Sequence, residues 1–480
     1  MGKLKYLSKN IALFSISNFV SKILVFLLVP FYTNVLTTYE YGVADVIQVT
    51  LLLLVPMVTV NIGEAALRFG IEETDNRNNI FRIGIKYVIR AAVFIAFACF
   101  AIRGVISVIN IPAFSKTEEL KWYLILFVFL FLTDAFYEFL VLFFQGCESV
   151  ETIVIGSISC TAATIGFNLF FLLGLKIGLN GYIFSQILAY LLASIVMVLI
   201  GKKKEIISDT KEDFSNLETR MLEYSRPMVV YSTASWVNNA VDRYFVLYLC
   251  GAAVNGVYGV AYKIPAILMV FQRIFAQAWQ LSATKAHKDT DSTEFFSDMY
   301  KIYNSFMVIG CGVLILIVKP LASFLFKKDF FEAWKLVAPL LISVIFGALT
   351  GFLGSICLAH KDSKSMGRAT GIGALVNVVL NLILIPYFSA MGAAIATGVS
   401  YFTMCFMALI FVRKHVDIKV TFVKNIISYI ILVAQSIVMI CELPYHFLIC
   451  GLLLIALITL YFKDFVSIIN VLLSKIKSSN

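Results

Sequence analysis

The chain has 480 residues, of which 60% are hydrophobic and 14% charged, and it carries a formal net charge of +10. Since a soluble protein has about 25% charged residues, this composition excludes a soluble enzyme, a disordered chain and a small disulfide-stapled secreted domain. The nine cysteines and four histidines form no C-x-x-C or H-E-x-x-H motif, so we predict neither disulfides nor a metal site. No nucleic-acid-binding motif accompanies the positive charge, so we expect no nucleic-acid partner and assign the charge to membrane-flanking loops.

Apolar segments of about 20 or more residues, each long enough to cross a bilayer as a helix, follow one another along the chain. We predict fourteen of them, at residues 11–36, 42–67, 83–109, 120–144, 152–174, 179–200, 224–249, 254–280, 300–326, 334–358, 367–387, 391–412, 420–440 and 444–462. The first is too long for a signal peptide and is expected to be an uncleaved span. The sequence therefore predicts an all-α polytopic membrane protein with about 14 transmembrane helices.

The basic residues predict the orientation of the chain. Twenty-six of the 39 lysines and arginines lie in or beside the N-terminus, the even-numbered loops and the C-terminal tail, whereas seven lie in or beside the odd-numbered loops. By the positive-inside rule both termini are cytoplasmic. One loop on the predicted outer side runs against the rule, since it contains Lys319, Lys327, Lys328 and Lys335.

A shift of 217 residues brings two parts of the sequence into register. Tyr41-Gly-Val-Ala falls on Tyr258-Gly-Val-Ala, and a looser match sets Asn168 against Asn381. Parallel repeats of this kind are a known transporter plan, with the binding site between the halves. We therefore predict an N-terminal lobe (1–200, six spans), a cytoplasmic linker (201–223), a C-terminal lobe (224–412, six spans) and two further spans with a cytoplasmic tail (413–480).

Charged residues inside apolar spans are candidates for function, because a charge at mid-bilayer costs about 2.5–3.5 kcal/mol on insertion scales. They concentrate in corresponding spans of the two predicted lobes: Lys22, Asp45, Glu64, Arg90, Arg103, Asp134, Glu138, Asp242, Arg243, Lys263 and Arg273. This distribution predicts a polar cavity between the halves, lined by spans one, two, seven and eight. We expect Lys22, Lys263 and Arg273 to give it positive potential for an anionic ligand.

Several of these charges also fit structural roles. Glu64 stands four residues before Arg68, so the two could pair along one helix. Arg68 and Arg103 lie near span ends, from which their guanidinium groups could reach the membrane surface.

Four further charges have two readings. Asp134 and Glu138 share a helix face, where two carboxylates repel; they fit either a proton site or a structural pair bonded to Arg90. Asp242 and Arg243 are neighbours that should point apart on a helix, so each needs a partner elsewhere. These four residues and Arg90 are candidates for ion coupling or for pairing in the cavity, as is Glu64.

Three stretches carry a resemblance to a known family. They are residues 18–45, which end in Glu-Tyr-Gly-Val-Ala-Asp; residues 257–265, Val-Tyr-Gly-Val-Ala-Tyr-Lys-Ile-Pro; and residues 376–397, which begin Val-Asn-Val-Val-Leu-Asn. With them the chain resembles the Wzx-type oligosaccharide-lipid flippases and polysaccharide exporters. These belong to the MOP superfamily, which also holds the lipid II flippase MurJ and the MATE drug exporters.

The resemblance implies two six-helix lobes around a cationic cavity, plus two C-terminal helices. It implies a transporter that moves polyprenyl-diphosphate-linked oligosaccharide to the outer leaflet by alternating access, for O-antigen, capsule or exopolysaccharide synthesis. The family's cavity charges carry over to Asp45 and Lys263, and further to Lys22 and Arg273, with Tyr262 as an aromatic candidate for sugar contact.

The same resemblance implies a location and partners. They are the cytoplasmic membrane of a bacterium, its lipids, and further polysaccharide assembly proteins. We expect no cofactor, and coupling to H⁺ or Na⁺ is left open.

Two other functions are considered. A MATE-like multidrug antiporter carries mostly cationic substrates and should have an acid-rich cavity, whereas span eight here is basic. A membrane-bound polysaccharide polymerase or transferase needs a sizeable outer loop for its catalytic groups, and the sequence offers none. We therefore expect a transporter and not an enzyme.

Overall fold

The computed structural model describes residues 26–108, 117–201, 214–286, 292–360 and 362–478. These residues are almost entirely helical and contain no strand, which confirms the predicted all-α fold. The chain divides into two compact units, Met1–Val237 and Asn238–Asn480, and the boundary falls within helix α9 (Phe214–Cys250). The predicted lobe boundaries stay a prediction.

Helices long and apolar enough to cross a membrane recur throughout the described ranges. There are nine such segments, or ten if the bent pair Ala252–Ala261 and Pro265–Ala276 is one span. One of the nine, Lys364–Val412, covers two predicted spans, and most of the first predicted span lies outside the described residues. The chain is thus a multi-pass membrane protein, and the count of fourteen stays a prediction.

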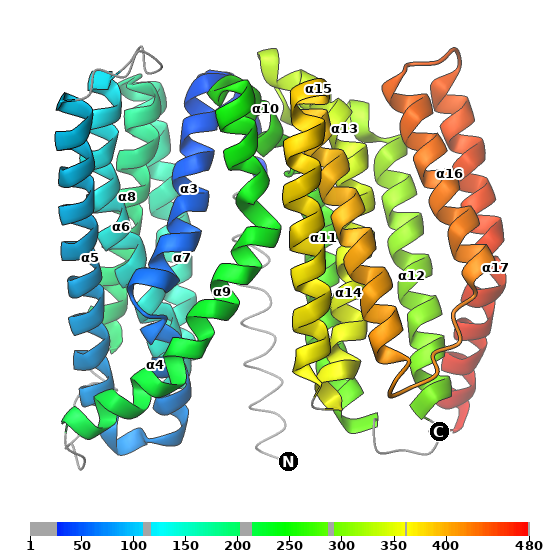
Figure 1. Ribbon diagram of the computed structural model, residues 1–480, viewed down its shortest axis with the longest axis horizontal. Coiled ribbons are helices and arrows are strands. Elements are labelled where there is room, and N and C mark those ends of the chain that lie inside the picture. The colour runs from blue at the N-terminus through cyan, green and yellow to red at the C-terminus, as the bar shows by residue number, and fades with distance from the viewer. Residues whose placement is uncertain (1–25, 109–116, 202–213, 287–291, 361, 479–480) are drawn as a thin grey trace. The chain divides into compact units, whose positions relative to one another are not determined.

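The first unit is a bundle in which α5, α6, α7 and α8 run side by side (Figure 1). Its elements are α2 (Val29–Val35), α3 (Thr38–Val58), α4 (Ile62–Glu72), η1 (Thr74–Asn76), α5 (Arg77–Val108), α6 (Thr117–Gly146), α7 (Val150–Asn168), the π-helical turn η2 (Leu169–Gly174), α8 (Gly178–Gly201) and the first part of α9. Thr37 begins α3 with a capping box, in which its hydroxyl accepts from the Glu40 amide while the Glu40 carboxylate accepts from the Thr37 amide.

Phenylalanines of α6 form the core of this unit. Phe131, Phe139 and Phe143 are buried, and Phe81 of α5 lies 5.2 Å from Phe143 between ring centroids. Gly84 makes this approach possible, because a Cβ there would lie 1.9 Å from the Phe139 ring. Any side chain at residue 84 would therefore push α5 away from α6.

The second predicted span of each repeat is broken at a different place. In the first unit α3 ends after Pro56, and Val60 and Asn61 adopt positive φ before α4 begins. In the second unit the break covers 262–264, directly before Pro265, and bends the span by 49°. Proline removes a backbone donor and crowds the preceding turn, so the positions of Pro56 and Pro265 account for the difference between the two copies.

The second unit is built around α14, which packs against α11, α12 and α15 and is mostly buried. Its elements are the end of α9, α10 (Ala252–Ala261), α11 (Pro265–Ala286), α12 (Ser292–Leu316), α13 (Val318–Leu325), η3 (Lys328–Ala333), α14 (Trp334–Ala359), α15 (Ser363–Val412), α16 (Phe422–Ile440) and α17 (His446–Ser478). Helix α15 contains a break at Ser389, with φ 51° and ψ −139°, where the sequence predicts the boundary between two spans.

A buried polar network joins the two C-terminal helices to α12. Asn304 of α12 donates to the Asn425 side chain of α16 (3.1 Å) and to the Tyr461 hydroxyl of α17 (3.0 Å), and it accepts from Tyr429 (2.7 Å). Ser428 lies 2.9 Å from the Tyr461 hydroxyl. Interhelical hydrogen bonds of this kind hold helices together in lipid, where no hydrophobic driving force acts between them.

The lysines of the exceptional outer loop are largely compensated. Lys319 pairs with Glu442 at 2.7 Å, and Lys335 pairs with Glu332 at 2.6 Å. Lys327 donates to the Ser323 carbonyl at 2.8 Å, near the end of α13. The local acidic groups and the helix end offset part of this positive charge, and the orientation of the chain stays a prediction.

We predict that Asn304→Leu lowers the free energy of unfolding by about 1–3 kcal/mol, because it leaves buried polar partners unsatisfied. Thermal unfolding of the purified protein in detergent measures this. Thr459→Val, which removes only an exposed local hydrogen bond on α17, is the matched control and should change stability little. Equal stability of Asn304→Leu and wild type would show that the network does not stabilise the fold.

Candidate functional site

The residues nominated from the sequence are divided between the two units. Lys22 lies outside the described residues. The first unit holds Asp45, Glu64, Arg90, Arg103, Asp134 and Glu138, and the second holds Asp242, Arg243, Tyr262, Lys263 and Arg273. That Asp45 and Lys263 line one cavity therefore stays a prediction.

Asp242 of α9 is the centre of a polar cluster inside the second unit. Its side chain is 3% exposed, and one carboxylate oxygen accepts hydrogen bonds from Tyr258 (2.5 Å), Tyr262 (2.9 Å) and Thr397 (3.2 Å). The three hydroxyls come from α10, the break after α10, and α15. Hydrogen bonds to the charged form stabilise a carboxylate that burial would otherwise penalise, so the three hydroxyls offset part of the cost of a negative charge on Asp242.

The side chain of Arg243, the neighbour of Asp242, also lies next to Tyr262. Its guanidinium lies 4.5 Å from the centre of the Tyr262 ring. As the sequence predicted, each of the two charged residues has its partners elsewhere, and they share one of them, because Tyr262 bonds Asp242 with its hydroxyl and faces Arg243 with its ring. Next to them the Tyr401 hydroxyl of α15 donates to the Asn239 side chain at 2.7 Å, which extends the polar surface by one turn of α9.

Lys263 and Arg273 flank the break of the second predicted span. Lys263 lies in the break itself and is half-buried, and Arg273 is exposed on α11. Within the described ranges neither side chain makes an ion pair. Both cations are thus able to attract an anionic ligand, whereas Asp45 is half-buried on α3 of the other unit.

Carboxylates gather on α4 and α6 in the first unit. Asp134 and Glu138 lie one turn apart on α6, and Glu64 of α4 is within electrostatic reach of Glu138. Neighbouring carboxylates repel one another, and a shared proton relieves the repulsion. The part of the chain that the structure describes contains no group of three or more His, Cys, Asp or Glu residues arranged to hold a metal.

Two pairings considered from the sequence are wrong. Arg68 pairs with Glu72 at 3.2 Å and lies over the Tyr224 ring, so it is not the partner of Glu64. Arg90 is not bonded to Asp134 or Glu138; it is exposed and lies 3.9 Å from Glu218 of α9. Arg68 has an acid four residues before it and another four residues after it on the same helix, and it pairs with the second. Arg90 reaches an acid on another helix, which spacing along one helix cannot predict.

Arg103 lies at the other end of α5. Its guanidinium donates to the Lys121 carbonyl, with an N···O distance of 3.4 Å. Since Lys121 stands near the start of α6, the contact is near the span end, as the sequence suggested for this arginine.

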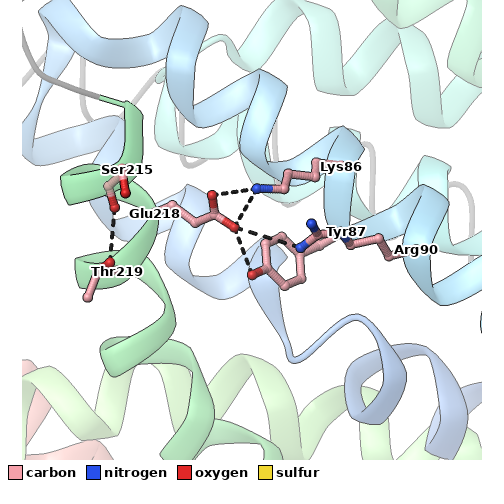
Figure 2. Close-up of polar contacts among 6 residues, drawn as sticks. All are labelled: Lys86, Tyr87, Arg90, Ser215, Glu218 and Thr219. Carbon is pink, nitrogen blue, oxygen red and sulfur yellow. Dashed lines mark hydrogen bonds and ion pairs between the residues drawn. The ribbon is translucent and has the colours of Figure 1, made fainter.

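Glu218 is held by three side chains of one helix, as Figure 2 shows. Lys86 donates to both of its carboxylate oxygens (2.8 and 2.6 Å), Tyr87 donates to one of them (2.9 Å), and Arg90 lies beside that oxygen. Partial burial raises the pKa of Glu218, but the hydrogen bonds from Lys86 and Tyr87 and the nearby positive charges outweigh burial and hold its pKa below the usual value.

The start of α9 has further charged attachments to the first unit. Arg220 pairs with Glu73 and lies over the Phe69 ring, and Lys86 lies over the Phe214 ring. Helix α9 therefore begins on α4 and α5 and ends in the second unit at the Asp242 cluster.

Sequence reasoning overlooked Lys86, Tyr87 and Glu218, and it overlooked Tyr258 and Thr397 as partners of Asp242. One signal was available: Arg82, Lys86 and Arg90 recur at intervals of four residues and so share a helix face. Glu218, in contrast, lies in the linker that was predicted to be a loop, and nothing in the sequence places it against α5.

Comparison with known proteins gives the following likenesses. Residues 7–283 match the family described as polysaccharide biosynthesis protein. An uncharacterised membrane protein of Methanocaldococcus jannaschii is 28% identical over 262 residues, covering 52% of this chain and 62% of that protein. A probable low-salt glycan biosynthesis flippase of Haloferax volcanii is 26% identical over 238 residues, covering 48% of this chain and 49% of that protein. The matches thus span about half to three fifths of these relatives' lengths.

Solved structures share the fold. The lipid II flippase MurJ in an inward closed conformation has a TM-score of 0.66 at 16% identity, covering 95% of this chain and 100% of MurJ. A multidrug resistance MATE family transporter of the MOP superfamily, in an inward-facing conformation, has a TM-score of 0.70 at 12% identity, covering 82% of this chain and 94% of its own. At such identities the likeness concerns the fold alone.

We predict that acidification weakens the Glu218 ion pair. A carboxylate whose folded pKa is lowered adds stability above its unfolded pKa and loses it as the pH falls through the folded value. The unfolding temperature of the wild type should therefore fall more steeply than that of Glu218→Gln between about pH 6 and about pH 3. Parallel slopes for the two proteins, measured by thermal unfolding in detergent, would contradict the ion pair.

Proposed function

The chain belongs to the polysaccharide biosynthesis protein family, and on that premise we propose that it flips lipid-linked oligosaccharide across a cell membrane. The substrate is an oligosaccharide repeat unit on a polyprenyl diphosphate, and the product is the same molecule in the outer leaflet. The reaction is transport by alternating access and involves no covalent step. The family match over 277 residues, 7–283, carries this proposal.

Charge and relatives support the same substrate class. A diphosphate-linked sugar is anionic, and the two cations of the broken span, Lys263 and Arg273, suit it. One relative is named as a probable glycan biosynthesis flippase, and the fold is that of a lipid flippase as well as of drug exporters. We assign Lys263 and Arg273 to the diphosphate, and Lys22 and Asp45 stay sequence predictions for the same binding site.

The Asp242 cluster is the proposed coupling site. Asp242, Thr397 and Tyr262 offer oxygen atoms to a proton or to Na⁺, and the carboxylate is buried among hydroxyls that reorient when its charge changes. Binding of either ion there would neutralise a buried charge. We propose H⁺ or Na⁺ as the coupling ion and no other cofactor.

We place the protein in the cytoplasmic membrane with both termini in the cytoplasm, as its basic loops suggest. Its partners are then the lipid-linked glycan, the surrounding lipids and the proteins that build and polymerise the glycan. The products are surface polysaccharides such as O-antigen, capsule or exopolysaccharide.

A MATE-like multidrug antiporter is the second candidate, because the MATE fold matches and Asp242 is a buried acid in a MATE-like bundle. The two functions differ in the sign of the transported charge. Transport of a cationic dye without transport of the anionic glycolipid would favour the antiporter.

We predict that Lys263→Ala lowers flipping of a fluorescent polyprenyl-diphosphate oligosaccharide by about tenfold, since a lost charge-assisted contact is worth roughly 1.5–3 kcal/mol. Proteoliposomes and a membrane-impermeant quencher measure the rate. Lys335→Ala, which removes a lysine paired with Glu332 on the predicted outer side, should flip at the wild-type rate. Normal flipping by Lys263→Ala would remove Lys263 from the site and leave the fold unaffected.

We also predict that Asp242→Asn abolishes the dependence of flipping on an imposed pH or Na⁺ gradient, because the amide carries no charge to neutralise. Thr459→Val serves as the control and should keep the gradient dependence. A variant at 242 that still responds to both gradients would place coupling elsewhere, with the acidic residues of α4 and α6 as the next candidates.

A further inference from the structure

The Glu218 carboxylate occupies a set of donors that is not specific for a carboxylate. An ammonium, a phenol and a guanidinium from one face of α5 surround it (Figure 2). Glu218 is 15% exposed, whereas Lys86 and Arg90 remain 32% and 60% exposed. The cations are therefore open to solvent or lipid on the side that Glu218 does not cover.

The exposed stripe of α5 changes from cationic to apolar along its length. Arg90 is followed on the same face by Val93, Phe97 and Phe100, all of them exposed. From Arg90 to Phe100 the helix rises about 15 Å. Lys86 stands about one turn inside the predicted span 83–109, at the level where lipid headgroups meet the hydrocarbon.

This order of groups matches the chemistry of a phospholipid or polyprenyl phosphate. Its phosphate carries negative charge and several acceptor oxygens, and it suits Lys and Arg beside a hydroxyl donor. Its hydrocarbon chain suits an exposed row of valine and phenylalanine. A bound carboxylate already shows that the donors converge on an anion.

We propose that Lys86, Tyr87 and Arg90 bind the phosphate of a lipid whose chain lies along Val93, Phe97 and Phe100, and that Glu218 competes with this phosphate for the same donors. The identification of that lipid with the transported polyprenyl diphosphate rests on the proposed function. The site itself rests on the contacts of α5.

Binding has a consequence for α9. Displacing Glu218 removes three of the contacts that hold the first turns of α9 on α5, and leaves the Arg220–Glu73 pair and the aromatic contacts. Because the boundary between the two units falls within α9, occupancy of the lipid site loosens the helix that connects them.

The test measures lipid binding without transport. Full-length protein in phosphatidylcholine nanodiscs is titrated with polyprenyl diphosphate, and binding is followed by native mass spectrometry. Removing the competitor with Glu218→Gln should tighten binding by about tenfold, and removing the cations with Lys86→Gln plus Arg90→Gln should weaken it by about tenfold or more. Tyr87→Phe, which keeps the ring and both cations, should weaken it by about threefold.

Arg103→Gln is the matched control, because it removes a cation from the other end of α5. It should leave binding within about twofold of wild type. If Glu218 only fastens α9, Glu218→Gln will leave binding unchanged or weaken it, and that result overturns the proposal. Wild-type binding by the variant that lacks both cations also overturns the proposal. If that double variant does not fold, Tyr87→Phe takes its place, and wild-type binding by Tyr87→Phe overturns the proposal.

A second titration with phosphatidylglycerol distinguishes the two lipid sources. Preference for the diphosphate assigns the site to the transported lipid, and equal affinity assigns it to bulk anionic lipid; both outcomes support a lipid-phosphate site. If the wild type flips no glycolipid yet shows these variant effects, the proposed function fails and the site stands.

Discussion

A polar or charged group surrounded by lipid or by packed side chains must have partners, and this constraint organises both units. In the second unit Asp242 is buried and stabilised by hydroxyls from three segments, and Asn304 links α12, α16 and α17. In the first unit Glu218 is bound by donors of α5. Each of these groups fixes helices that apolar contacts alone would leave free to slide, because lipid tails are as apolar as leucine.

Helix α9 contributes an acidic residue to each of the two units. It carries Glu218 near its start, with partners in the first unit, and Asp242 near its end, with partners in the second. A transporter that alternates between states has to change some contacts along such a helix, and charged contacts are the ones that a ligand or an ion can change. In our two proposals an anion displaces Glu218 and a cation neutralises Asp242, so the two ends of α9 would respond to opposite charges.

The sequence predicted the fold class and most helix positions, because long apolar runs in lipid leave the backbone few alternatives to a helix. It also nominated Asp242, Arg243 and Tyr262, which the structure brings together. It failed for Arg68, which pairs with Glu72 instead of Glu64, two acids at the same spacing on its own helix. It also failed for Arg90, whose partner Glu218 lies on another helix. The sequence shows which residues share one face of a helix, but the residue that a long side chain reaches on another helix depends on how the helices pack. For the same reason Thr397, far along the chain, could not be assigned to Asp242.

The central claim is that the protein moves an anionic glycolipid, and the sidedness of that lipid in cells tests it most directly. Cells depleted of the protein are treated with a membrane-impermeant reagent that modifies sugars, and the protected fraction of lipid-linked oligosaccharide is measured. The account predicts that this lipid accumulates in protected form, on the inner leaflet, while tolerance of cationic drugs is unchanged. Normal exposure of the glycolipid together with lost drug tolerance would contradict it.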